Sequence, residues 1–190
     1  MYKQLVILLF NFIVRPKKAW KECSEAQDTD NAGFLKSYLY PVFGIIALFS
    51  FAGILLYLKK WDVQIAIKQV VINTVSCFAG FYIAVFALSR LSRKYFGQNL
   101  TTAVCERFTG YASAAVYVIT MFYVFFPFFP YIQLLTVYTF YIVWQGSAHY
   151  LQIKNEYLTK FTIFAGIIII LAPLIMRWLL VLTIPGAGKF

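Results

Sequence analysis

Five long apolar stretches, separated by short polar segments, dominate the pattern of the chain. An α-helix needs about 20 apolar residues to cross a hydrocarbon core of about 30 Å, and each stretch is long enough. The expected spans cover about residues 38–58, 65–91, 108–126, 131–150 and 161–184. The pattern predicts an all-α fold, a polytopic membrane bundle of five transmembrane helices.

A shorter apolar run, residues 5–14, precedes these spans. As a helix it would rise about 15 Å, half of the hydrocarbon core, so it is expected to lie at the membrane interface. The residue before a proline resists helix, and proline suits the first turn of a helix. The first interfacial helix should therefore end at Arg15, and a second should run from Pro16 to about Gln27. Trp20 is expected to anchor this second helix at the interface.

Polar segments supply the predicted connections. Residues 28–36 form a connector, and residues 97–99 form a turn before Thr101, which can cap the next helix. The uncharged segment Pro127–Pro130 is short enough to make the third and fourth spans an antiparallel hairpin. The predicted organisation is a cytoplasmic interfacial segment, residues 1–36, followed by a transmembrane domain, residues 37–190.

Composition supports the membrane interpretation. Hydrophobic residues make up 62% of the chain and charged residues 13%, whereas soluble domains have about 45–50% and about 25%. The net charge of +10 does not indicate nucleic-acid binding, because the basic residues lie in short segments between apolar runs instead of on one soluble face.

The distribution of basic residues predicts the orientation, since cytoplasmic loops are enriched in Lys and Arg. With a cytoplasmic N-terminus, twelve basic residues lie on the cytoplasmic side: Lys3, Arg15, Lys17, Lys18, Lys21, Lys36, Arg90, Arg93, Lys94, Arg107, Lys154 and Lys160. Five lie on the opposite side: Lys59, Lys60, Lys68, Arg177 and Lys189. We therefore expect the N-terminus in the cytoplasm and the C-terminus across the membrane.

Small residues recur every four positions on two of the spans. Ser76, Gly80 and Ala84 do so on the second, and Gly110 and Ala114 on the third. Such faces let helix backbones approach closely in lipid, where van der Waals packing is a main source of cohesion. They indicate helix contacts.

Four polar residues within the spans are candidates for function: Asn73, Gln145, His149 and Arg177. Polar groups at this depth are often functional, but interhelical hydrogen bonds explain them without a substrate. His149 could serve as a proton relay or a ligand, although no carboxylate lies beside it in sequence. Arg177 lies past the middle of the last span and is expected to extend its side chain toward the far interface.

No catalytic or metal-binding motif is present. The chain has no HExxH motif and no phosphate-binding G-x-x-x-x-G-K-[ST] loop. Cys23, Cys77 and Cys105 are isolated and show no zinc or disulfide spacing. The sequence predicts neither an enzyme, nor a metal site, nor a cofactor.

Several features in order resemble the Yip family, named for Ypt-interacting proteins. They are Arg15-Pro16-Lys17-Lys18-Ala19-Trp20, Tyr40-Pro41, Glu106-Arg107-Phe108-Thr109-Gly110-Tyr111 with Ala112 to Ala115, the Pro127/Pro130 turn, and Gly146. The resemblance implies five spans and a cytoplasmic N-terminus. Eukaryotic members are linked to Rab GTPases and vesicle traffic. The N-terminal segment here is short, which resembles a compact bacterial member of the inner (cytoplasmic) membrane and argues against Rab binding.

The candidate binding residues lie at the predicted cytoplasmic face: Trp20, Arg90, Arg93, Lys94, Glu106 and Arg107. Anionic lipid, a membrane or cytosolic protein, or a second copy of the chain could be the partner. The leading hypothesis is a non-enzymatic adaptor or organiser that acts through protein or lipid binding. The alternative is a small transporter, a channel, or the membrane substrate-binding subunit of an importer.

Overall fold

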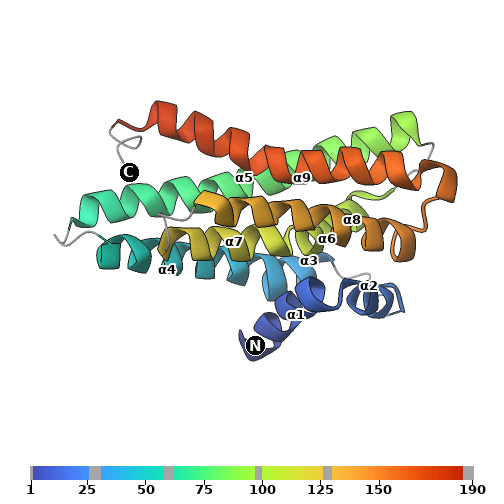
Figure 1. The fold of residues 1–190 in the computed structure, drawn as a ribbon, viewed down its shortest axis with the longest axis horizontal. Helices are drawn as coiled ribbons and strands as arrows, with labels where there is room; N and C mark the ends of the chain where they lie inside the picture. The colour runs from blue at the N-terminus through green and yellow to red at the C-terminus, as the bar shows by residue number, and fades with distance from the viewer. Residues whose placement is uncertain (1, 26–30, 58–61, 97–99, 126–129, 186–190) are drawn as a thin grey trace.

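The computed structural model describes residues 2–25, 31–57, 62–96, 100–125 and 130–185. Almost all of these residues are helical, and no strand occurs among them, so the predicted all-α class is confirmed. Figure 1 shows the long helices side by side along one axis, with the N-terminal helices against one side of the bundle.

Two short helices begin the chain. Helix α1 covers Tyr2–Val14 and helix α2 covers Pro16–Glu25. Arg15 separates the two helices, because the proline that follows disfavours helix at that residue. The predicted division into two helices is confirmed. Helix α2 packs against α8, and α1 contacts α2, α6 and α7.

The predicted connector at residues 28–36 is wrong for residues 31–36, which are helical. A short helix α3 (Asn31–Phe34) and a π-helical turn η1 (Leu35–Leu39) lead directly into α4 (Tyr40–Tyr57). Phe34 and Tyr38 are buried and stack with their ring centres 5.5 Å apart. Burial of these aromatic rings offsets the low helix propensity of the segment.

Helix α5, Val63–Tyr95, is the longest helix and packs against both α4 and α9. The Asp62 carboxylate caps it by accepting a hydrogen bond from the Ile65 N–H at 3.2 Å. Ser76, Gly80 and Ala84 are all buried on this helix. The predicted small-residue face is thus part of a helix contact.

The predicted third span is bent. Helix α6, Thr102–Ala112, and helix α7, Ala114–Phe125, meet at Ser113 with an angle of 42°. The Ser113 hydroxyl donates to the Thr109 carbonyl oxygen at 2.7 Å, a back-bond that often bends helices. The predicted cap is confirmed, because Thr101 Oγ1 accepts from the Val104 N–H at 3.4 Å.

The predicted fourth span also has two parts. A 3₁₀ helix η2, Pro130–Val137, precedes α8, Tyr138–His149. Both parts contact α7, in agreement with the predicted hairpin. The last helix, α9, covers Asn155–Thr183 and contains Pro173; it begins earlier than the predicted span.

Three helical segments are long and apolar enough to cross a membrane within the described ranges: Leu35–Leu56, Val63–Tyr95 and Asn155–Thr183. The bent pair α6–α7 raises the number to as many as four, so the predicted count of five is not confirmed. Large apolar side chains cover the outside of the bundle, among them Leu48, Leu56, Phe86, Trp178 and Leu182. These features define a helical membrane protein.

Several predicted features fall outside the described residues. They are Lys59, Lys60 and Lys189 on the far side, residues 26–27 of the second interfacial helix, residues 28–30 of the connector, the turn at residues 97–99, and the turn residues before Pro130.

Candidate functional site

Trp20 is a core residue in the structure. Its side chain is 0% exposed, and its indole N–H donates to the Ile142 carbonyl oxygen of α8 at 3.0 Å. A Cβ atom added to Gly146, one turn further along α8, would lie 2.7 Å from the indole ring. Glycine therefore provides the space in which α2 meets α8. The expected interfacial anchor is incorrect, because protein atoms surround the ring instead of lipid.

Four more aromatic rings surround Trp20 and form what we call the Trp20 cluster: Phe12, Phe108, Tyr111 and Tyr150. Phe12 stacks on Tyr111 at 4.4 Å between ring centres, and Phe108 lies 5.5 Å from Trp20. Tyr150 lies 5.4 Å from Trp20. The cluster joins α1, α2, α6 and the end of α8, so it fixes the N-terminal helices on the bundle.

Arg90, Arg93 and Lys94 are exposed at the C-terminal end of α5. We call these three residues the α5 rim. The Arg90 guanidinium lies 5.1 Å from the centre of the Phe86 ring, and Lys94 Nζ lies 5.4 Å from that of Tyr95. Cations near a helix C-terminus are favoured by its dipole, so the local fold supports these positions.

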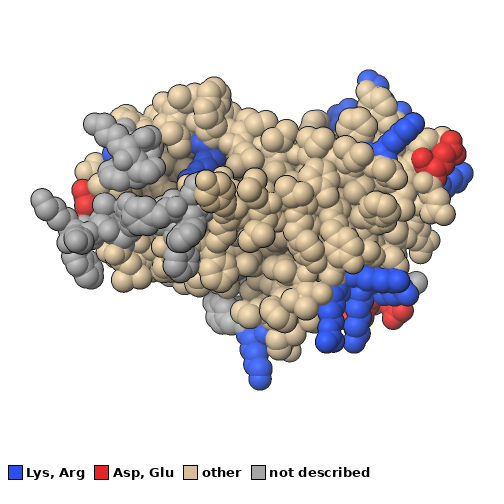
Figure 2. All heavy atoms as spheres, in the orientation of Figure 1, with Lys and Arg blue, Asp and Glu red and all other residues tan. Residues whose placement is uncertain are grey.

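A second basic group lies on α2, where Lys17, Lys18 and Lys21 are exposed. Lys18 pairs with Glu22 at 3.6 Å. Figure 1 places α2 and the end of α5 at the same end of the bundle but on opposite sides of it. Figure 2 shows Lys and Arg gathered at that end and over the N-terminal helices, while the middle of this face is mostly uncharged.

Arg107, predicted beside the α5 rim, is only 8% exposed and lies inside the protein. With Glu22, Ser37 and Tyr111 it lines a cavity of about 250 Å³ between α6 and the N-terminal helices. Glu106 is half-buried. The structure brings Arg107 to α2, and it leaves Arg90, Arg93 and Lys94 at the surface.

Two of the predicted intramembrane polar residues make hydrogen bonds. The Asn73 amide N–H donates to Ser50 Oγ of α4 at 3.0 Å, joining α4 to α5. His149 Nδ1 lies 3.0 Å from the Gln145 carbonyl oxygen, so the Nδ1–H tautomer donates within α8. Both His149 and Gln145 are half-buried.

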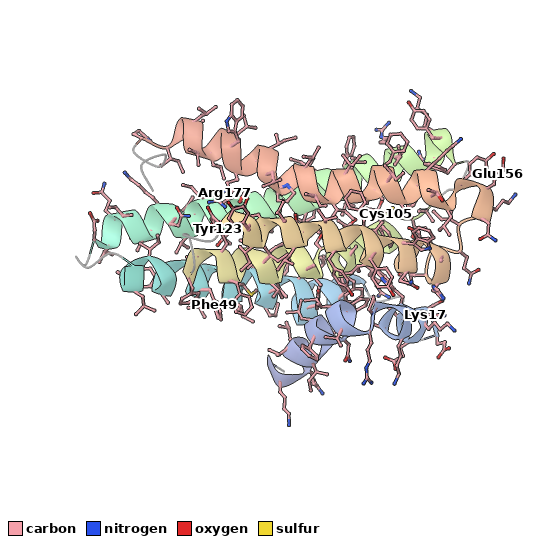
Figure 3. All side chains as sticks on the ribbon, viewed as in Figure 1. Lys17, Phe49, Cys105, Tyr123, Glu156 and Arg177 are labelled. Carbon is pink, nitrogen blue, oxygen red and sulfur yellow. The ribbon has the colours of Figure 1, made fainter. Side chains whose placement is uncertain are left out.

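Arg177 lies in a cavity of about 210 Å³ between α5, α7, η2 and α9, which we call the Arg177 cavity. Its guanidinium carbon lies 5.3 Å from the centre of the Tyr123 ring of α7. Asn73, Thr120 and Gln133 also line the cavity. Figure 3 shows Arg177 and Tyr123 toward the end of the bundle opposite Lys17 and Glu156.

The sequence did not indicate that these polar residues share a cavity. Asn73, Thr120 and Gln133 were visible as polar positions in separate spans, but their meeting depends on how the bent α7 and the 3₁₀ helix pack against α5 and α9. Among the described residues, no group of three His, Cys, Asp or Glu side chains is placed to hold a metal ion.

The fold defines the class of protein, and a match to a known domain family defines the family. The chain is a helical membrane protein, as its apolar spans indicate. Residues 10–176 match the Yip1 domain, and the chain therefore belongs to the Yip1 domain family. The resemblance noted in the sequence is thus confirmed. No curated protein and no solved structure gives a significant match.

Proposed function

We propose that this chain is a non-enzymatic membrane adaptor with five spans and a cytoplasmic N-terminus, which binds an acidic protein partner through the α5 rim. In this arrangement residues 1–36 form a cytoplasmic interfacial segment and residues 37–190 the transmembrane domain. The membrane is the cytoplasmic membrane of a bacterium.

The lengths of the helices support five crossings. The bent pair α6–α7 rises about 36 Å, because an α-helix rises about 1.5 Å per residue. A 3₁₀ helix rises about 2.0 Å per residue, so η2 and α8 together extend about 34 Å. Each exceeds a hydrocarbon core of about 30 Å. The 3₁₀ segment lets a relatively short stretch of chain complete the fourth crossing.

The observation that carries the proposal is the exposure of Arg90, Arg93 and Lys94 at the C-terminal end of α5. Arg holds carboxylates with two parallel hydrogen bonds. Anionic lipid also attracts such residues, by about 1 kcal/mol each near the surface. A protein partner differs from lipid in that it responds to the geometry of the guanidinium as well as to its charge.

The test is photo-crosslinking in the native membrane from a photoreactive amino acid at Tyr95, which is exposed beside the rim. We expect a discrete crosslinked species in the wild-type background. It should disappear when Arg90, Arg93 and Lys94 are changed to Ala. It should weaken several-fold when Arg90 and Arg93 are changed to Lys, because the bidentate geometry is lost.

The matched control changes two exposed basic residues of α2, Lys17 and Lys21, to Ala, because α2 lies on the other side of the bundle from the rim (Figure 1). This variant should crosslink as the wild type does, and all variants should insert normally. If the Arg90→Lys, Arg93→Lys variant crosslinks like the wild type while the Ala variant does not, the rim acts through electrostatic attraction alone. Absence of any discrete species would contradict the adaptor proposal.

A transport function is the second candidate, favoured by the Arg177 cavity inside the bundle. It requires a small water-soluble substrate in that cavity. Native mass spectrometry of the purified chain distinguishes the transport function from the adaptor function. Reproducible small-molecule adducts favour transport, and lipid adducts alone favour the adaptor.

A further inference from the structure

The Arg177 cavity lies within the apolar part of the bundle. Pro173 of α9 packs against Gly80 near the middle of α5, where an added Cβ would lie 2.6 Å from the proline backbone. Arg177 is one turn beyond this crossing, about 6 Å further along α9. A cation at this depth is costly unless it has a partner of opposite charge or water.

The described residues that line the cavity provide no such charge. None of them is acidic, and Arg177 is instead stacked near the Tyr123 ring. Asn73 also lines the cavity and is only 1% exposed. Its Oδ1 atom has no hydrogen-bond partner among the described residues, although its amide N–H is bonded to Ser50. A buried polar atom in this state is uncommon in folded proteins.

The exposed residues that line the cavity are mainly apolar, with Gln133 as the polar one among them. Leu134 of η2 and Leu174 of α9 line it and are also exposed on the outside of the bundle. The volume, about 210 Å³, is below the range of about 300–1,000 Å³ found for sites that enclose a whole drug-sized ligand. This volume is large enough for a head group with a few waters, while hydrocarbon tails would lie outside, along the exposed leucines.

We propose that the Arg177 cavity binds the anionic head group of a membrane phospholipid, which enters sideways from the bilayer. Arg177 neutralises the head group, and Asn73 and Thr120 line the same cavity as polar neighbours. The site lies away from the α5 rim and does not depend on the proposed adaptor function.

The test uses the full chain in detergent with an equal mixture of phosphatidylglycerol and phosphatidylcholine that carry identical acyl chains. Native mass spectrometry measures the ratio of the two adducts. We expect the wild type to prefer phosphatidylglycerol by about tenfold, as for a hydrogen bond to a charged group. Arg177→Gln should bring the ratio to within about twofold of unity, and Arg177→Lys should keep most of the preference.

Two further variants serve as controls. Lys154→Gln removes an exposed charge elsewhere and should keep the preference. Leu134→Trp enlarges an exposed side chain at the mouth without changing charge, and it should lower retention of phosphatidylglycerol. This second variant tests the site even where Arg177→Gln does not fold.

A wild type that binds both lipids equally, or a preference that survives in folded Arg177→Gln, would overturn the proposal. A last measurement uses inorganic phosphate to test whether the cavity binds a water-soluble anion. At matched ionic strength it should not raise the unfolding temperature more than chloride does. A phosphate-specific increase that Arg177→Gln abolishes would assign the cavity to a water-soluble anion instead of a lipid.

Discussion

At the scale of single residues, Trp20 joins two parts of the chain that are far apart in sequence. Its indole N–H bonds to a carbonyl oxygen 122 positions away, and its ring fills the space that Gly146 leaves. A buried tryptophan that both packs and donates a hydrogen bond is difficult to replace. The N-terminal helices therefore depend on this one side chain for much of their attachment.

We expect Trp20→Phe to lower the free energy of unfolding by about 2–4 kcal/mol, because the hydrogen bond is lost and the smaller ring leaves a void. Thermal unfolding of the purified protein in detergent provides the measurement. Trp178→Phe is the matched control, since Trp178 is 63% exposed, and it should change stability by no more than about 0.5 kcal/mol. Equal effects of the two variants would contradict the core role of Trp20.

The sequence identified Trp20 and Arg107 as important but misplaced both. A tryptophan next to lysines on a short helix is typical of a membrane interface, and an arginine in a loop with other basic residues suggests a surface. Whether either side chain is buried depends on how α2 and α6 pack, which is a long-range property. By contrast, the cap at Thr101 is a local feature, and local chemistry was sufficient to predict it.

At the scale of elements, the contact between α5 and α9 depends on Gly80. The backbone of Pro173 occupies the space where a side chain at position 80 would begin. Close approach of this kind increases the van der Waals contact that holds helices together in lipid. The proline at that point also leaves the Ile169 carbonyl without its usual helical donor.

We expect Gly80→Ala to lower stability by about 1–3 kcal/mol, because the new methyl group forces α5 and α9 apart. Gly44→Ala is the matched control: nothing lies within 4 Å of its added Cβ, so the higher helix propensity of alanine should leave stability equal or raise it by up to about 1 kcal/mol. Chemical unfolding followed by circular dichroism measures both. A tolerated alanine at position 80 would show that the two helices can separate without cost.

Hydrophobic periodicity and proline positions predicted where most elements lie, including the division at Arg15 and the end of the last helix near residue 184. They did not predict the bend at Ser113 or the 3₁₀ form of residues 130–137. An apolar stretch looks the same in sequence whether its helix is straight, bent or tightly wound. These features result from back-bonding hydroxyls and from packing against neighbouring helices.

At the scale of the whole molecule, the number of crossings and their direction follow from the proposed role of η2–α8 as a span. Five crossings put the two termini on opposite sides of the membrane, whereas four would put them on the same side. Figure 1 shows the end of α9 at one end of the bundle, whereas α2 lies toward the other end and α1 nearer the middle.

We expect reporter fusions after Leu100 and Gln152 to report the cytoplasm, and fusions after Asp62 and Pro185 to report the opposite side. The positive-inside rule gives the physical reason, since twelve of the seventeen basic residues then face the cytoplasm. A Gln152 fusion that reports the opposite side, together with a Pro185 fusion that reports the cytoplasm, would indicate four crossings and would show that η2–α8 does not span the membrane.

The length of α5 has a consequence for the kind of bilayer that suits this protein. Between Lys68 and Arg90 the helix carries no charged residue, a distance of about 33 Å along its axis. A membrane core of about 30 Å accommodates that length when the helix leans from the normal, and a thinner core requires a greater lean. Helix α9 packs along α5, and Lys68 Nζ donates to the Pro185 carbonyl oxygen at 2.9 Å, so a change in the lean of α5 also moves α9. Bilayer thickness therefore sets the angle of both helices together and changes the shape of the space between them.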